Sequence, residues 1–163
     1  MDAQGCHVDS RTGKRHCHKS SLPKKSQGFS GKVTAVKDGD TVEVLRNGKA
    51  VRVRLAEVDC PEKSQAYGQK AKLFTSAMVF GKDVTVEVRT TDRYGRLVGE
   101  VLLSDGRSLN RELVKAGLAW WYRAYSKDES IGKLEDEARK ARLGLWAEQL
   151  PVAPWEFRRK GRV

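Results

Sequence analysis

Short segments that alternate apolar and polar residues constrain the fold of this chain most strongly. Three of them, "GKVTAV", "TVEVLR" and "AVRVRLAEV", follow one another after Phe29. Alternation with a period of two is typical of strands with one buried face. Asn47 and Gly48, between the second and third segments, favour a tight turn, so we expect three antiparallel strands. Two later segments, "KDVTVEVRT" and "LVGEVLLSDG", alternate in the same way and predict two more strands.

Between and after these strands, apolar residues recur at the intervals that are typical of a helix. The segment "AYGQKAKLFTSAMVFG" has apolar residues at Ala71, Phe74, Ala77 and Met78 and ends at Gly81, which indicates an amphipathic helix. The segments "LNRELVKAGL" and "DESIGKLEDEARKARLGLW" predict two further helices. Five strands with a helix after the third are typical of the OB-fold, a small Greek-key barrel. We therefore expect an α+β protein with a five-stranded Greek-key β-barrel and about three packed helices.

Length and composition indicate one domain with polar extensions. The chain has 163 residues, which suits a single core. Residues 1–28 are rich in Lys, Ser, His and Gly, residues 29–147 hold the strands and helices, and residues 148–163 read as a basic, Pro-interrupted tail. Lys and Arg number 32 against 21 Asp and Glu, for a net charge of +11. This excess favours a polyanionic partner, although the same charge can serve solubility alone.

The sequence predicts no membrane span, because it contains no run of about 18 apolar residues. It also shows no apolar leader of the length that a signal peptide needs. Two cysteines in the polar N-terminal segment, Cys6 and Cys17, suit an oxidising compartment if they pair. We therefore expect a secreted or periplasmic protein whose export signal has been removed. No feature indicates a protein partner, and we expect a monomer.

Three carboxylates lie close together in this basic sequence: Asp40, Asp59 and Glu62. Asp40 precedes one expected strand and Asp59 follows the next, so a barrel can bring the two together. Adjacent carboxylates repel one another unless a cation lies between them. Ca²⁺ and Mg²⁺ are hard cations that prefer such oxygen ligands. The alternative is an Asx-type turn at Asp38 to Asp40 that binds nothing.

Four motifs resemble the staphylococcal nuclease family in their order and approximate spacing: "DGDTV", "VRLAEVDCPE", "DRYGR" and "LVKAGLAW". The resemblance covers about residues 29–147. It implies that Asp40 and Asp59 bind Ca²⁺, assisted by the backbone carbonyl of Cys60. The best-known member has Thr at the position of Cys60, and a ligand from the backbone should tolerate this change.

The resemblance also assigns the catalytic residues. It implies that Glu62 orients or deprotonates the attacking water and that Arg54 and Arg96 bind the phosphate. Guanidinium groups suit that role because they bond two phosphate oxygens at once. Taken singly, Arg54 can also be read as an exposed strand residue and Arg96 as a turn residue.

The expected activity is Ca²⁺-dependent hydrolysis of phosphodiester bonds in DNA, with RNA as a second candidate substrate. The resemblance implies products with a 3′-phosphate, and a shallow barrel groove favours single strands with little sequence specificity. Tyr94 and Tyr122 are candidates for stacking on bases.

The alternative function is a non-catalytic OB-fold module that binds nucleic acid, but such a module would not need the complete set of acids and arginines. An adaptor that docks through its tails is a weaker third possibility. The tryptophans are expected to pack: Trp120, Trp121, Trp146 and Trp155.

The N-terminal segment "GCHVDSRTGKRHCH" has a self-consistent hairpin register. Folded about Arg11 and Thr12, it places Cys6 opposite Cys17 and His7 opposite His16. Directly opposed cysteines can approach the distance of a disulfide, so we expect a bond between Cys6 and Cys17. A zinc site with Cys6, Cys17 and two histidines is one alternative, and a disordered tail is another.

Overall fold

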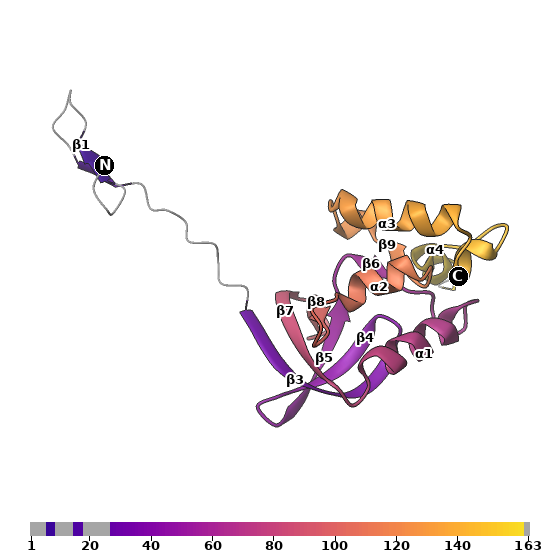
Figure 1. The fold of residues 1–163 in the computed structure, drawn as a ribbon, viewed down its shortest axis with the longest axis horizontal. Coiled ribbons are helices and arrows are strands. Elements are labelled where there is room, and N and C mark those ends of the chain that lie inside the picture. Colours follow the sequence, from indigo (N-terminus) through magenta and orange to yellow (C-terminus); the bar gives the residue numbers. More distant parts are fainter. Residues whose placement is uncertain (1–5, 9–14, 18–26, 162–163) are drawn as a thin grey trace.

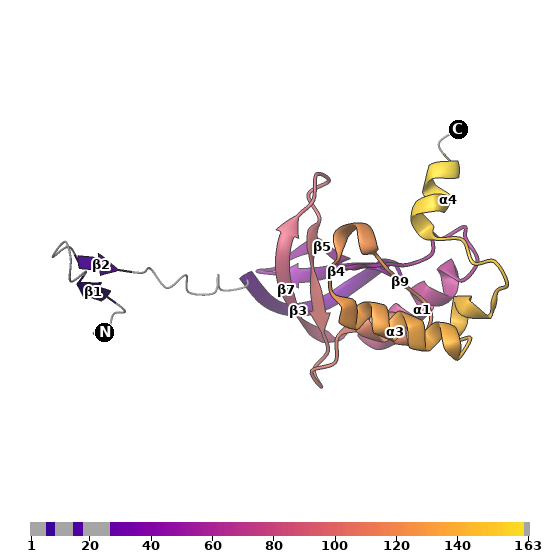
Figure 2. The same ribbon diagram turned by 90° about the horizontal axis from the view of Figure 1, so that it is seen from above.

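The computed structural model describes residues 6–8, 15–17 and 27–161 (Figure 1). From Gln27 onwards it contains a closed five-stranded barrel in the order β3-β4-β5-β8-β7, with helices gathered around it (Figures 1 and 2). The barrel strands are β3 (Gln27–Asp38), β4 (Thr41–Arg46), β5 (Lys49–Leu55), β7 (Asp83–Thr91) and β8 (Leu97–Leu102). The α-helices are α1 (Gly68–Val79), α2 (Leu109–Lys115), α3 (Glu129–Lys140) and α4 (Pro154–Lys160).

The barrel confirms the expected fold class. β3, β4 and β5 pair antiparallel in sequence order, and β7 pairs antiparallel with both β3 and β8. A parallel pairing of β5 with β8 closes the barrel. Asn47 and Gly48, which join β4 to β5, have φ angles of 50° and 79°. Positive φ at both positions is what a tight hairpin turn requires, and Asn and Gly tolerate it best.

The alternating segments place their apolar residues inside the barrel. Val42 and Val44 of β4 are fully buried, as is Val53 of β5, whereas Arg52 beside it is exposed. Helix α1 adds Ala71 and other buried residues to this core. Full burial of a Val or Leu side chain contributes about 1.5 to 3 kcal/mol, so the valine-rich strands account for much of the stability. In the part of the chain that is described, no helix is long and apolar enough to cross a membrane.

A second, two-stranded sheet carries part of the candidate site. β6 (Val58–Asp59) pairs antiparallel with β9 (Trp120–Trp121), and Asp59 lies opposite Trp120. The backbone N–H of Tyr122 extends this contact by donating to the carbonyl of Glu57 at 2.9 Å. The short sheet therefore fixes Asp59 and Tyr122 beside each other at one end of the barrel.

The C-terminal segment differs from the expected tail. Pro154 stands in the first turn of α4, where its missing N–H costs nothing. The Trp155 ring stacks on Tyr122, with centroids 5.4 Å apart, and meets Trp120 edge-on at 5.5 Å. Trp120 and Trp146 are buried and in contact, which agrees with the expected packing role. The residues after 147 thus add a fourth α-helix that packs on the β6–β9 region.

The N-terminal strands pair in the expected register. β1 (Cys6–Val8) and β2 (Arg15–Cys17) are antiparallel, with Cys6 opposite Cys17 and His7 opposite His16. The turn expected at Arg11 and Thr12 lies outside the described residues. The disulfide, its zinc alternative and the export inferred from it remain predictions.

We expect peptide mapping without reduction to recover Cys6 linked to Cys17, because the register sets them opposite each other. Cys60 should react with an alkylating reagent only after unfolding, since it is 3% exposed. A free Cys6, or a link from Cys6 to Cys60, would contradict the pairing. Stoichiometric zinc in the purified protein would favour the zinc alternative.

Candidate active site

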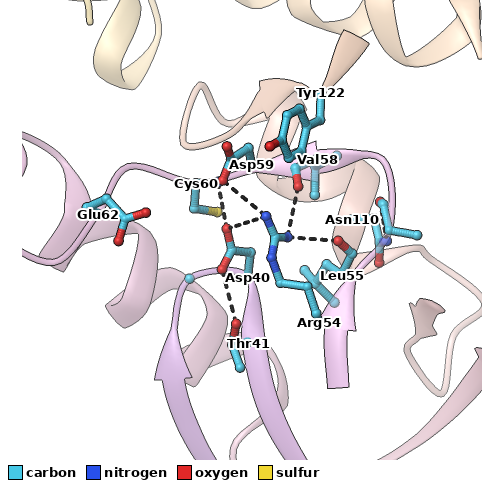
Figure 3. Close-up of polar contacts among 12 residues, drawn as sticks. Asp40, Thr41, Arg54, Leu55, Val58, Asp59, Cys60, Glu62, Asn110 and Tyr122 are labelled. Carbon is cyan, nitrogen blue, oxygen red and sulfur yellow. Dashed lines mark hydrogen bonds and ion pairs between the residues drawn. The ribbon is translucent and has the colours of Figure 1, made fainter. Parts of the chain in front are cut away.

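Three carboxylates gather at one end of the barrel (Figure 3). Asp40 lies in the turn between β3 and β4, Asp59 ends β6, and Glu62 lies in the loop before α1. Asp40 and Asp59 are 7% and 1% exposed, whereas the Glu62 side chain is 34% exposed. The two aspartates are therefore withdrawn from water, and Glu62 faces the solvent side of the cluster.

The Arg54 side chain connects this cluster to the barrel (Figure 3). Its Nη1 donates to the carbonyls of Leu55 and Val58 at 2.8 and 2.9 Å. Its Nη2 donates to Asp59 Oδ1 at 3.1 Å and lies 3.4 Å from Asp40 Oδ2. Burial alone would lower the pKa of Arg54, but Asp40 and Asp59 raise it, so the group stays charged. With its side chain only 14% exposed, Arg54 is not an exposed strand residue.

Asp40 is held by contacts from distant parts of the chain. The backbone N–H of Cys60 donates to Asp40 Oδ2 at 2.8 Å, and the Thr41 hydroxyl donates to Oδ1 at 3.3 Å. The backbone N–H of Leu55 donates to the Asp40 carbonyl at 2.9 Å. These contacts reach Asp40 from β5 and the loop after β6, so its carboxylate does more than cap a local Asx turn. The N–H of Cys60 is engaged in this way, and the Cys60 thiol is buried.

A second arginine, Arg158 of α4, binds the same carboxylates. Its Nη1 donates to Glu62 Oε1 at 2.7 Å and to Asp59 Oδ1 at 3.1 Å, and its Nη2 donates to Asp59 Oδ2 at 2.7 Å. Burial would lower the pKa of Arg158, but its hydrogen bonds to the two carboxylates raise it above the ordinary value. No motif in the sequence around Arg158 indicates this role. The only local signal was a basic run after Pro154, which is typical of a helix end.

Burial also sets the charge balance at Asp59. Burial is the largest single influence on the pKa of Asp59 and raises it, whereas the hydrogen bonds from Arg158 and the charge of Arg54 lower it, and the net shift is upward. Asp40 adds to the rise, because the two carboxylates repel each other. A further positive charge near Asp59 would therefore stabilise its ionised form.

The loop that carries Glu62 is fixed at its base. The Glu62 carbonyl accepts from the backbone N–H of Gln65 at 2.9 Å, and the Glu62 N–H donates to Gln65 Oε1 at 3.1 Å. Gly68, at the start of α1, packs against this backbone so closely that a Cβ there would lie 1.9 Å from the Glu62 carbonyl oxygen. Glycine at position 68 therefore lets the loop pass close to the helix and sets the position of Glu62.

Arg96 and Tyr94 lie in the turn between β7 and β8. Arg96 Nε donates to Asp92 Oδ2 at 2.7 Å, as expected for a turn residue. Val98, two residues later, pairs with Arg54 across β5 and β8. Tyr94 is 69% exposed and available for stacking.

The Tyr122 ring already has an aromatic neighbour, because Trp155 stacks on it. Its hydroxyl lies 3.4 Å from Arg158 Nη2. The structure thus gathers Asp40, Arg54, Asp59 and Glu62, sets Tyr122 at their edge, and engages Arg96 with Asp92.

The donor set suits a hard divalent cation in its chemistry. Asp40 and Asp59 offer oxygen ligands, which Ca²⁺ prefers, and the two carboxylates converge on one region. Among the residues that the structure describes, no group of three or more His, Cys, Asp or Glu is arranged around a common ion position. In this arrangement the guanidinium groups of Arg54 and Arg158 bond the oxygens of Asp59.

A closed OB-fold barrel with a carboxylate and arginine cluster at one end suits a protein that acts on nucleic acid. A family model described as "Staphylococcal nuclease homologue" matches residues 52–148. The chain belongs to this family.

Named relatives agree with this assignment. An "Uncharacterized endonuclease" of Escherichia coli O157:H7 is 43% identical over 140 residues, which cover 86% of this chain and 92% of the relative. A "Micrococcal nuclease" of Shigella flexneri is 38% identical over 144 residues, covering 82% and 83% of the two chains. The "Staphylococcal-like nuclease CAN1" of Arabidopsis thaliana is 44% identical over 120 residues, covering 74% of this chain and 36% of the plant protein. These matches support a nuclease function and a nucleic-acid substrate.

Replacing Gly68 by Ala should destabilise the fold and displace Glu62, because the new methyl group would overlap the Glu62 carbonyl. We expect a loss of about 1 to 3 kcal/mol in the free energy of unfolding, measured by denaturant titration. Gly161→Ala is the matched control, since a Cβ there meets its nearest atoms at 3.7 Å, an ordinary contact distance. Equal stability of the two variants would contradict the role given to Gly68.

Proposed function

We propose that this protein is a Ca²⁺-dependent nuclease that cleaves DNA, and RNA as a second substrate, with little sequence specificity. The observation that carries the proposal is the cluster of Asp40, Arg54 and Asp59 at one end of the barrel, with Glu62 to one side of it (Figure 3). Two buried carboxylates suit metal binding, and a more exposed third carboxylate beside them suits proton transfer. The barrel and the family membership support a nucleic-acid substrate.

Exposure separates the roles of the carboxylates. Asp40 and Asp59 are almost fully buried and cannot readily exchange a proton with water. Glu62 is partly exposed, so its carboxylate can take a proton from a water molecule that attacks the phosphorus. Ca²⁺, when bound to Asp40 and Asp59, would supply positive charge to the phosphate oxygens.

The arginines have the complementary role. Arg54 holds its guanidinium between the two aspartates, so a phosphate at this end of the barrel would meet a fixed positive charge. Arg96, in the neighbouring turn, can exchange Asp92 for a phosphate oxygen, because phosphate offers it a bidentate acceptor. Donors fixed in this way stabilise the charge that grows on the oxygens in the transition state.

The alternative function is a non-catalytic module that binds nucleic acid through the same barrel. Such a module would need the positive charge but not a partly exposed carboxylate beside two buried ones. Cleavage therefore separates the two functions, whereas binding alone does not.

Digestion of single-stranded DNA, duplex DNA and RNA, each with Ca²⁺, Mg²⁺ or excess chelator, tests the proposal. We expect cleavage with Ca²⁺, fastest on single strands because an unpaired strand fits a shallow groove, and products that carry a 3′-phosphate. Undiminished cleavage in chelator would overturn the metal assignment. Binding without cleavage under every condition would favour the non-catalytic module.

Glu62→Gln should keep the hydrogen bond to Arg158, through the amide carbonyl, but lose the base. We expect turnover to fall by about 100-fold or more, while the affinity for a single-stranded oligonucleotide changes little. Glu148→Gln, at an exposed position outside the site, is the control and should cleave at the wild-type rate. A Glu62→Gln variant with wild-type turnover would show that another group takes the proton.

Binding of nucleic acid should depend steeply on salt if several Lys and Arg side chains contact phosphates. The logarithm of the association constant should then fall linearly with the logarithm of salt concentration, by about 0.7 for each phosphate contact on a single strand. Fluorescence anisotropy with a labelled oligonucleotide and Glu62→Gln protein measures the slope without cleavage. A flat response would assign the net charge of +11 to solubility.

A further inference from the structure

The C-terminal helix places a positive charge on the carboxylates that the proposed function gives to the cation. The two terminal nitrogens of Arg158 bond both oxygens of Asp59 and one oxygen of Glu62, at 2.7 to 3.1 Å. Arg54 donates to Asp59 as well. Three of the roughly four lone-pair sites of the Asp59 carboxylate are therefore engaged, so a metal ion that binds both of its oxygens must displace at least one of these donors.

The net charge of the cluster indicates that Arg158, rather than Arg54, leaves Asp59 when a cation binds. Asp40, Asp59 and Glu62 carry three negative charges, and Arg54 and Arg158 carry two positive charges. Without Arg158 the balance would be two negative charges, which one divalent cation neutralises. With Arg158 in place, the cation would lie within a few ångström of a guanidinium and be repelled. Arg54 is the more buried of the two and also bonds two backbone carbonyls, so it stays.

The helix that carries Arg158 is attached by a limited set of contacts. It is seven residues long, and Pro154 is its one buried residue in the described structure. Its apolar anchor is Trp155, which lies on Tyr122 and Trp120. An open cavity of about 580 Å³ separates part of the helix from the loop after Glu62. The cavity is lined by Asp38, Glu62, Lys63, Ser64, Phe157, Arg158 and Gly161.

We propose that α4 is a displaceable cap on the active site, in which Arg158 and a divalent cation compete for Asp59. Cation binding and helix docking are then linked. The bound cation favours release of the helix, and the docked helix lowers the affinity for the cation. The inference rests on the proposed function, because it takes Asp40 and Asp59 as the cation ligands. It adds a form of regulation: the docked helix lowers the affinity for the cation and covers the site while no cation is bound.

Titration calorimetry with Ca²⁺ at fixed ionic strength tests the cap in the full-length chain. Arg158→Gln removes the competing charge, and Trp155→Ala weakens the anchor without touching a carboxylate. Both variants should bind Ca²⁺ about tenfold or more tightly than wild type, as expected if the docked state holds about nine-tenths of the molecules. Arg159→Gln is the matched control, since it removes the same charge from the exposed next residue and should bind like wild type.

Hydrogen exchange gives a readout that does not depend on catalysis. Saturating Ca²⁺ should increase early deuterium uptake in the peptide of α4 and leave α3 unchanged, because only α4 is released. If Ca²⁺ binds wild type and Arg158→Gln equally, or α4 stays protected in bound wild type, the cap is wrong and the metal assignment stands. If no protein binds Ca²⁺, the metal assignment itself fails and the cap fails with it.

Discussion

The buried guanidinium of Arg54 is the interaction on which this end of the molecule depends. It bonds the carbonyls of Leu55 and Val58 and pairs with both Asp40 and Asp59. Without it, Asp40 would lose this ion pair and Asp59 would keep only Arg158, and breaking a buried pair in this way costs about 3 to 5 kcal/mol. Lys could not replace it, because a single ammonium cannot span four acceptors in one plane. Arg54 therefore shapes the site before it meets any phosphate.

The same carboxylates explain why the C-terminal helix lies where it does. Arg54 compensates only part of their negative charge, and Arg158 supplies more from the other side. Trp155 brings this charge into place by stacking on Tyr122, which β9 and the loop after it hold beside Asp59. The apolar anchor and the ion pairs thus act together, and the site is built from both ends of the folded domain.

Much of this arrangement could be predicted from the sequence, because its signals are local. Period-two alternation and the Asn47 and Gly48 turn predicted the strands of the barrel and the hairpin of β4 and β5. The carboxylates Asp40 and Asp59 were expected to meet because Asp40 precedes one expected strand and Asp59 follows another. Arg158 could not be found in this way, since 99 residues separate it from Asp59 and no periodicity links them. Pro154 and the basic run after it do suggest a helix, but only packing shows where that helix docks.

We propose that the acids at this end of the barrel hold a cation beside Arg54. A crystal structure of the Glu62→Gln variant with Ca²⁺ and a short single-stranded oligonucleotide tests it most directly, because this variant should bind without cutting. We expect an ion on the carboxylates of Asp40 and Asp59, a phosphate on Arg54, and Arg158 withdrawn from Asp59. An ion bound elsewhere, with Arg158 still paired to Asp59, would contradict it.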